Sequence, residues 1–96
     1  MYIIVHHAIT DAPRFWDTAA QAIPNVPDHL KLHHTITAKN GAIATCLWEG
    51  ASVQDVREFL EPALGSVSRN TYEEAENRDG VAMPSGVNLS DPMSAR

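Results

Sequence analysis

Four of the five histidines in the chain form two adjacent pairs, His6-His7 and His33-His34, and the single cysteine is Cys46. Imidazole and thiolate groups are ligands that suit zinc, nickel or copper, and a histidine, which titrates near neutrality, can act as a general base. Each histidine pair lies in a run that is typical of a β-strand, where successive side chains point to opposite faces. At most one histidine of each pair can therefore reach a given site.

The spacing of these residues does not indicate a particular reaction. The chain has no Cys-x-x-Cys or His-Glu-x-x-His metal motif, no phosphate loop, no nucleotide or flavin motif and no Ser-His-Asp order. Cys46 as a nucleophile needs a base nearby, and its neutral strand context gives no sign of a lowered pKa. Whether the protein is an enzyme is left open.

Length and charge narrow the class of protein. A chain of 96 residues has room for one hydrophobic core. Its net charge of −5, with only seven scattered Lys and Arg residues, argues against nucleic-acid and membrane-surface partners. One cysteine cannot form an internal disulfide, and residues 1–5 open an apolar run without a basic leader, so we expect a cytoplasmic protein.

Apolar periodicity, helix-start residues and turn residues predict six elements. Strands are expected at residues 2–9, about 30–38, 43–49 and about 67–75, and helices at about 10–23 and 52–64. The order β-α-β-β-α-β is that of a ferredoxin-like α+β fold, an antiparallel four-stranded sheet with two helices on one face and the first and third strands central. Residues 1–77 are assigned to this domain, and residues 78–96 to a polar tail that is flexible or docked on a partner subunit.

The two faces of the sheet can be separated by assuming a two-residue turn at Asn40-Gly41, which sets Thr35 opposite Cys46 and His33 opposite Trp48. The more aliphatic face is expected under the helices, and it carries Ile3, Val5, His7, Ile9, Leu32, His34, Ile36, Ala38, Ile43, Thr45 and Leu47. The open face then carries Tyr2, Ile4, His6, Ala8, His33, Thr35, Thr37, Ala44, Cys46 and Trp48.

This open face is too apolar to remain in contact with water, because large exposed apolar patches on small domains usually mark an interface. The simplest cover is the same face of a second copy, related by a two-fold axis. Two such sheets packed face to face close into an α+β barrel. We therefore expect a homodimer with the architecture of a dimeric α+β barrel.

A resemblance supports the same architecture. Residues 45–50, Thr-Cys-Leu-Trp-Glu-Gly, lead into the helix at 52–64, Gly65 and the strand that begins at Val67. This stretch resembles the second half of a small bacterial domain-of-unknown-function family, and the resemblance covers residues 42–75, with a looser match over residues 1–9. Members of that family have a ferredoxin-like dimeric α+β barrel, and at least one binds nickel. The resemblance thus implies the fold, the homodimer and nickel as a candidate ligand.

The candidate site follows from these assignments. His6, His33 and Cys46 share the predicted open face, and together they are candidate ligands for nickel or zinc. Trp48 and Tyr72 are candidates to line a small-molecule cavity, since such cavities are mostly apolar. The simpler alternative is that His33 packs beside Trp48, that Cys46 is a small buried hydrophobic residue and that Trp48 and Tyr72 pack in an interface.

Other polar residues receive structural roles. His7 and His34 are expected to be hydrogen-bonded core residues, and His29 a solvated one. On the fourth strand, Asn70 and Tyr72 share one face, while Arg69 and Thr71 share the other. The sequence leaves open which of these two faces points inward.

Three functions remain after these steps. The first is a homodimer, of unproven activity, that binds a metal ion or small ligand in a cavity on the open sheet face. The second is a cofactor-independent oxygenase or isomerase acting on a small organic substrate in the barrel, with His6 or His33 as the general base and Asn70 or Tyr72 orienting a substrate oxygen. The third is a structural dimer whose barrel is filled by side chains.

Overall fold

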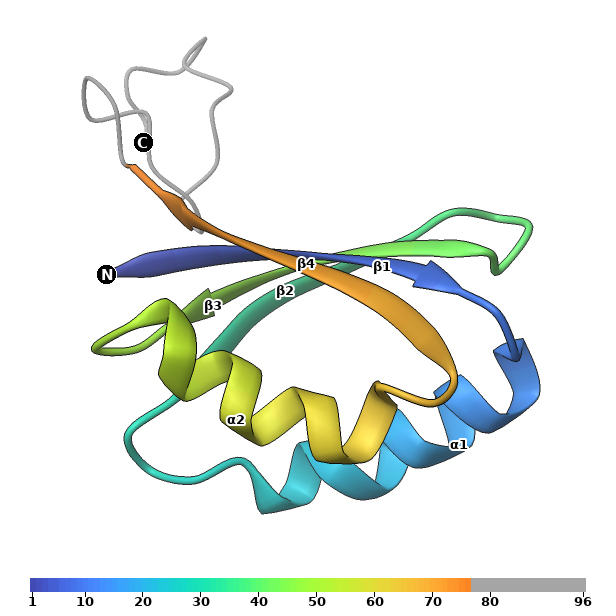
Figure 1. The fold of residues 1–96 in the computed structure, drawn as a ribbon, viewed down its shortest axis with the longest axis horizontal. Helices are drawn as coiled ribbons and strands as arrows, with labels where there is room; N and C mark the ends of the chain where they lie inside the picture. The colour runs from blue at the N-terminus through green and yellow to red at the C-terminus, as the bar shows by residue number, and fades with distance from the viewer. Residues whose placement is uncertain (77–96) are drawn as a thin grey trace, which may run out of the picture.

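The computed structural model describes residues 1–76 and confirms the predicted β-α-β-β-α-β order (Figure 1). The elements are β1 (Tyr2–Ile9), α1 (Ala12–Ala22), a short 3₁₀ turn (Ile23–Asn25), β2 (Lys31–Thr37), β3 (Ile43–Glu49), α2 (Val53–Leu64) and β4 (Ser68–Ala75). The strands form one antiparallel sheet in the order β2-β3-β1-β4, and both helices cover the same face of it. This is the ferredoxin-like α+β fold. The predicted tail at 78–96 lies outside the described residues.

Both helices begin at the residues that the sequence indicates. The Asp11 carboxylate accepts a hydrogen bond of 3.2 Å from the backbone N–H of Arg14, and the Ser52 hydroxyl accepts one of 3.1 Å from that of Asp55. Such caps satisfy backbone donors that have no partner inside the first turn of a helix. The two helices are thereby fixed at their entry points, α1 directly after β1 and α2 directly after β3.

The hydrophobic core lies between the sheet and the two helices. It consists of Ile3, Val5, Phe15, Leu30, Cys46, Trp48, Val56, Leu60, Leu64 and Val67. The Trp48 ring meets Phe59 of α2 edge-on, with 5.9 Å between ring centroids. Large aromatic rings dominate the energetics of such cores. Trp48 is therefore a central residue of the covered face.

This placement corrects the predicted faces of β3. Directly opposite residues of antiparallel strands share a face, and β1 pairs with β3 so that Ile3 lies opposite Trp48 and Val5 opposite Cys46. Ala44, Cys46 and Trp48 therefore lie under the helices, and the prediction that placed them on the open face is wrong. The aliphatic residues Ile43 and Leu47 occupy the open face instead, because the pairing with β1 decides the face of β3.

The strand β2 also departs from its predicted register. Thr35 lies opposite Cys46 as expected, but the register shifts between Leu32 and His34, so Leu32 and not His33 lies opposite Trp48. This irregularity makes His33 an extra residue in the strand. Leu32 lies on the covered side of the sheet, as predicted. Beyond the shift the faces are exchanged relative to the prediction, so Thr35 lies on the covered side and His34 and Ile36 on the open side.

The β2-β3 turn keeps the predicted register at Thr35 with a different geometry. The backbone N–H of Gly41 donates a hydrogen bond of 2.9 Å to the carbonyl of Ala38, so Lys39 and Asn40 are the central residues of the turn. Gly41 follows with a φ of 75°, a left-handed conformation that favours glycine. The expected two-residue turn at Asn40-Gly41 is therefore displaced by one residue.

The open face of the sheet retains exposed apolar side chains. Ile4, Ile36 and Ile43 are 40%, 65% and 44% exposed.

Over residues 1–76, none of the helices has the length and apolar character needed to cross a membrane.

Candidate functional site

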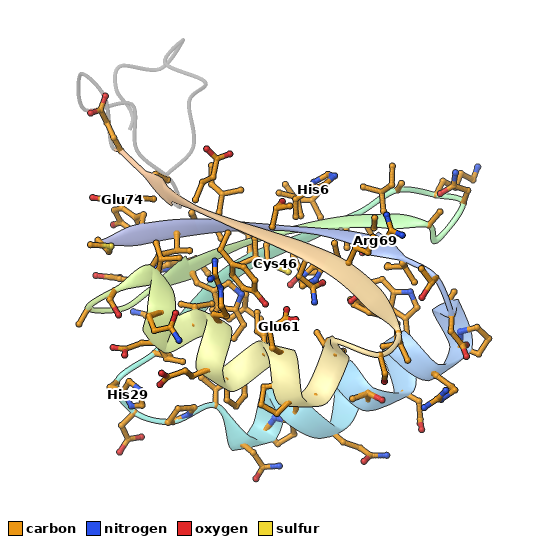
Figure 2. All side chains as sticks on the ribbon, in the orientation of Figure 1. His6, His29, Cys46, Glu61, Arg69 and Glu74 are labelled. Atoms are coloured by element: carbon orange, nitrogen blue, oxygen red, sulfur yellow. The ribbon has the colours of Figure 1, made fainter. Side chains whose placement is uncertain are left out.

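The three predicted metal ligands are separated by the fold. His6 lies on the open face, where its Nδ1 is 2.9 Å from the hydroxyl of Thr45. His33 pairs with the Glu49 carboxylate, with 2.8 Å between Nε2 and Oε1. Cys46 lies on the other side of the sheet, between the strands and the helices (Figure 2). The prediction that His6, His33 and Cys46 share one face is therefore wrong.

These positions do not fit a nickel or zinc ion. A structural zinc site is normally built from four ligands that converge on one point, and softer metals also need converging donors. Within residues 1–76, no group of three or more His, Cys, Asp or Glu side chains is arranged to hold a metal ion. The site is therefore better described by its other feature, a cavity.

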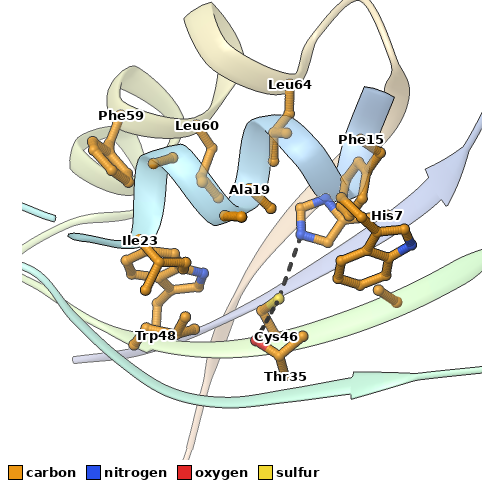
Figure 3. A pocket seen from close by; sticks show the side chains of 15 residues that line it. His7, Phe15, Ala19, Ile23, Thr35, Cys46, Trp48, Phe59, Leu60 and Leu64 are labelled. Atoms are coloured by element: carbon orange, nitrogen blue, oxygen red, sulfur yellow. Dashed lines mark hydrogen bonds between the residues drawn. The ribbon is translucent and has the colours of Figure 1, made fainter. Parts of the chain in front are cut away.

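A cavity of about 240 Å³ lies between the sheet and the two helices (Figure 3). Its walls are almost entirely apolar, with α1 contributing Ala19, Ala20 and Ala22 and α2 contributing Leu60 and Leu64. Interiors are normally close-packed, so an opening of this size needs a local cause. The three alanines of α1 provide one, because their side chains are too short to fill the space above the sheet.

A few polar groups are placed in this apolar wall. The Cys46 Sγ lies 3.5 Å from Nε2 of His7 and 3.5 Å from the hydroxyl of Thr35. Trp48 also lines the cavity, and its indole nitrogen is the one buried side-chain nitrogen or oxygen in the described part of the chain that has no hydrogen-bond partner. Binding sites for small molecules typically combine apolar walls with a small number of such groups.

A chain of hydrogen bonds behind His7 fixes the orientation of its ring. The Glu61 carboxylate can only accept, so the Asn70 side-chain amide donates to it through Nδ2, at 2.8 Å. The Asn70 oxygen then faces Nδ1 of His7 at 2.6 Å, and Nδ1 must carry the proton. The hydroxyl of Tyr72 donates to the same Glu61 carboxylate. The Nε2 of a neutral His7 therefore carries no proton, and it can accept a hydrogen bond from the Cys46 thiol.

The environment keeps both members of the Cys46-His7 pair neutral. Burial lowers the pKa of His7, an effect that the hydrogen bond to Asn70 only partly offsets. Burial likewise raises the pKa of the Cys46 thiol, against the smaller effect of Thr35. The pKa of Glu61 is lowered, mainly by the hydrogen bond from Tyr72, so that end of the chain is negatively charged. The resting pair is thus a thiol that donates to a neutral imidazole.

The structure also decides what the sequence left open. Asn70 and Tyr72 point toward the helices, because their hydrogen bonds reach Glu61 on α2. His7 is buried and hydrogen-bonded, and His29 is exposed, as predicted. His34 is not on the covered face: it lines a small hollow of about 100 Å³ on the open face, together with Ile4, Ile36, Thr45, Cys46 and Leu47. The register shift in β2 explains that error.

Two site residues, His7 and Glu61, have no ligand-site role in the sequence prediction. A signal for the cavity was present in the alanines of the first helix, which are small residues on a helix that must cover a sheet. Of the predicted ligand-binding residues, Cys46 and Trp48 line the cavity, and Asn70 and Tyr72 lie behind His7. His6 and His33 lie away from it.

Comparison of the chain with family models, with curated proteins and with solved structures finds no match in any of the three.

Proposed function

We propose that the protein binds a small, mostly apolar organic molecule in the cavity between the sheet and the helices. The observation that carries this proposal is the Trp48 indole N–H, which is buried in the cavity wall and has no partner within residues 1–76. Leaving a buried donor unpaired costs about 1–3 kcal/mol. A ligand with an acceptor oxygen, such as a carbonyl, recovers that cost while its apolar part fills the cavity.

The volume indicates the size of the ligand. An apolar cavity of about 150 Å³ can hold a benzene molecule. The cavity here, at about 240 Å³, has room for a single aromatic ring with a short side chain. Benzylacetone, a phenyl ring joined to a methyl ketone by two methylene groups, combines that size with one acceptor oxygen. It is therefore a suitable probe of the cavity.

We also propose that the open face of the sheet binds a second copy of the chain. Support comes from Ile4, Ile36 and Ile43, which are exposed on this face around the neutral side chain of Thr45 and the imidazoles of His6 and His34. The pairing of β1 with β4 also puts Arg69 and Glu73 on this face, but both lie on the edge strand β4, so an identical face is the best complement of the isoleucines. The ligand cavity lies on the other side of the sheet, so each subunit carries its own.

The ligand proposal is tested by titrating the protein with benzylacetone and following tryptophan fluorescence and calorimetric heat. For a ligand of this size we expect a dissociation constant of about 0.1 mM or tighter. The variant Ala19→Leu fills the cavity and should weaken binding at least tenfold. Gln21→Leu places the same side chain at an exposed position of α1 that does not line the cavity, and should bind like the wild type. Absence of saturable binding, or equal effects of the two variants, would contradict the proposal.

A further inference from the structure

We propose that Cys46 is a nucleophile activated by His7, and that it adds to small α,β-unsaturated carbonyl compounds that enter the cavity. This inference rests on the proposed function, because the cavity must first admit the ligand. It goes further by assigning a covalent chemistry and a class of electrophile to the site.

The first support is the geometry of the thiol and its base. Sγ of Cys46 and Nε2 of His7 are 3.5 Å apart, within hydrogen-bond reach for sulfur. A nucleophile beside a base, which is in turn oriented by a third group, is the arrangement that activates weak nucleophiles in proteins. Asn70 is that third group here, since its side-chain oxygen holds the Nδ1–H of His7 at 2.6 Å. A thiol, an imidazole and an amide in this order form the Cys-His-Asn variant of the catalytic triad.

The second support is that the thiol faces the ligand space. Cys46 lies in the cavity wall, and Figure 3 shows its sulfur between the His7 ring and Thr35. The Thr35 hydroxyl can donate a hydrogen bond to the sulfur once the thiol has lost its proton, because the two atoms are 3.5 Å apart. A structural buried cysteine needs neither a base nor a second donor. The sulfur therefore has a base that can take its proton, and a donor that partly offsets the cost of its buried charged form.

The third support selects the electrophile. When a thiol adds to an unsaturated carbonyl compound, negative charge develops on the carbonyl oxygen, and a preorganised donor that faces this oxygen stabilises it. The Trp48 indole N–H is a buried donor without a partner in the wall of the same cavity. Trp48 and Cys46 are two residues apart on β3 and point to the same side of the sheet. An apolar cavity also favours a neutral electrophile over a charged one.

The reaction balances without any further reagent. The Cys46 S–H proton passes to Nε2 of His7 as sulfur forms a bond to the β-carbon, and the electron pair of the carbon–carbon double bond moves to give an enolate. The Trp48 N–H donates a hydrogen bond to the enolate oxygen. His7 then returns its proton to the α-carbon. The product is a thioether adduct of Cys46, and no leaving group, oxidant or reductant is needed.

The test compares two ligands that have the same carbon skeleton. Benzylideneacetone is the unsaturated counterpart of benzylacetone, and its adduct is detected as a mass increase on Cys46 by mass spectrometry of the full chain. We expect His7→Gln to lower the rate constant of adduct formation at least about 100-fold, the lower end of the usual contribution of a general base. His6→Gln changes the adjacent histidine on the opposite face, and should remain within about twofold of the wild type. Equal rates in the two variants would overturn the proposal.

A second measurement needs no variant. With His7 as the base, the rate constant of the wild type should reach a plateau near neutral pH, once His7 has lost its proton. A rate constant that keeps rising tenfold per pH unit above neutrality would show that free thiolate is the nucleophile, and would overturn the role of His7. If benzylacetone binds and benzylideneacetone forms no adduct with Cys46, this inference fails and the proposed function stands. If benzylacetone does not bind, the proposed function fails as well.

Discussion

The two faces of the sheet give neighbouring residues opposite environments. His6 lies on the open face and meets Thr45 at an exposed hydrogen bond of 2.9 Å. His7, the next residue, is 1% exposed and is held between Cys46 and Asn70 in the wall of the cavity. The same side-chain chemistry thus becomes a surface group on one face and an oriented acceptor on the other. Coverage by the helices, more than residue type, creates the candidate site.

The open face differs from the covered face in what is needed to complete it. On the covered face, the helices supply the apolar partners, and the space left over is the ligand cavity. On the open face, exposed isoleucines have no cover within the described chain, and we propose a second copy as that cover.

The largest expected effect comes from truncating adjacent isoleucines of β1. Ile3 is fully buried under the helices, whereas Ile4 is 40% exposed on the open face. We expect Ile3→Ala to lower the free energy of unfolding by about 3 kcal/mol, because it leaves a void in the core. Ile4→Ala should cost less than about 1 kcal/mol when urea denaturation is measured in dilute solution, where association contributes little. Similar losses for both variants would mean that the two faces are not distinct.

The second prediction concerns the cover of the open face. Sedimentation at micromolar concentration should show a homodimer for the wild type. Ile36→Lys places a charge on a side chain that is 65% exposed, and we expect it to weaken dimerisation at least 100-fold, since burying an unpaired charge at an interface is costly. Ile23→Lys is the matched control, because Ile23 is an exposed isoleucine outside the sheet. A monomeric wild type would contradict the proposed dimer.

The third prediction compares the hydrogen bonds of the two histidines. Asn70→Ala removes the partner of His7 in a partly buried position, and we expect a loss of about 2 kcal/mol in the free energy of unfolding. Thr45→Ala removes the partner of His6 at an exposed position, and should change stability by no more than about 0.5 kcal/mol. Chemical denaturation of both variants measures the difference. If Thr45→Ala proved the more costly change, the assigned roles of the faces would be reversed.

The fourth prediction is a pH dependence that comes from His7. Its pKa in the folded protein is lowered by burial, so the unfolded chain takes up a proton at a higher pH than the folded chain. The stabilisation that comes from neutral His7 should therefore be complete above the ordinary histidine pKa of about 6.5. The free energy of unfolding should fall as the pH decreases below that value, by up to about 1.4 kcal/mol per pH unit. Glu61, whose pKa is also lowered, acts at lower pH, because its contribution is lost only as the pH falls below the ordinary carboxyl pKa of about 4.3.

Thermal or urea denaturation between pH 5 and pH 8 measures this slope. His7→Gln should flatten it, whereas His29→Gln, which removes an exposed histidine from the loop before β2, is the matched control. A slope that survives in His7→Gln would show that another group causes the pH dependence.

The order of the elements could be predicted because its signals are local. The caps at Asp11 and Ser52, and the turn around Asn40-Gly41, each act within a few residues. Local hydrogen bonds of this kind determine where helices and hairpins begin and end. Together with strand alternation they were sufficient for the ferredoxin-like fold.

The composition of the site depended on pairings between distant strands. The face of Cys46 follows from its position opposite Val5, and the inward direction of Asn70 follows from Glu61 on α2. His33 is an extra residue that shifts the register of β2, and no turn motif in the sequence predicted this shift. Counting aliphatic residues selected the wrong face of β3. Burying the large ring of Trp48 stabilises the core more than burying Ile43 or Leu47.

We propose that the covered face of the sheet, and not the open face, holds the ligand. Nuclear magnetic resonance of ¹⁵N-labelled protein during a titration with benzylacetone distinguishes the two faces. We expect a saturable shift of the Trp48 indole N–H resonance, because this donor gains a carbonyl partner, while the amide resonances of Ile4 and His6 move little. Saturable shifts confined to residues of the open face, with the Trp48 N–H resonance unchanged, would contradict this proposal.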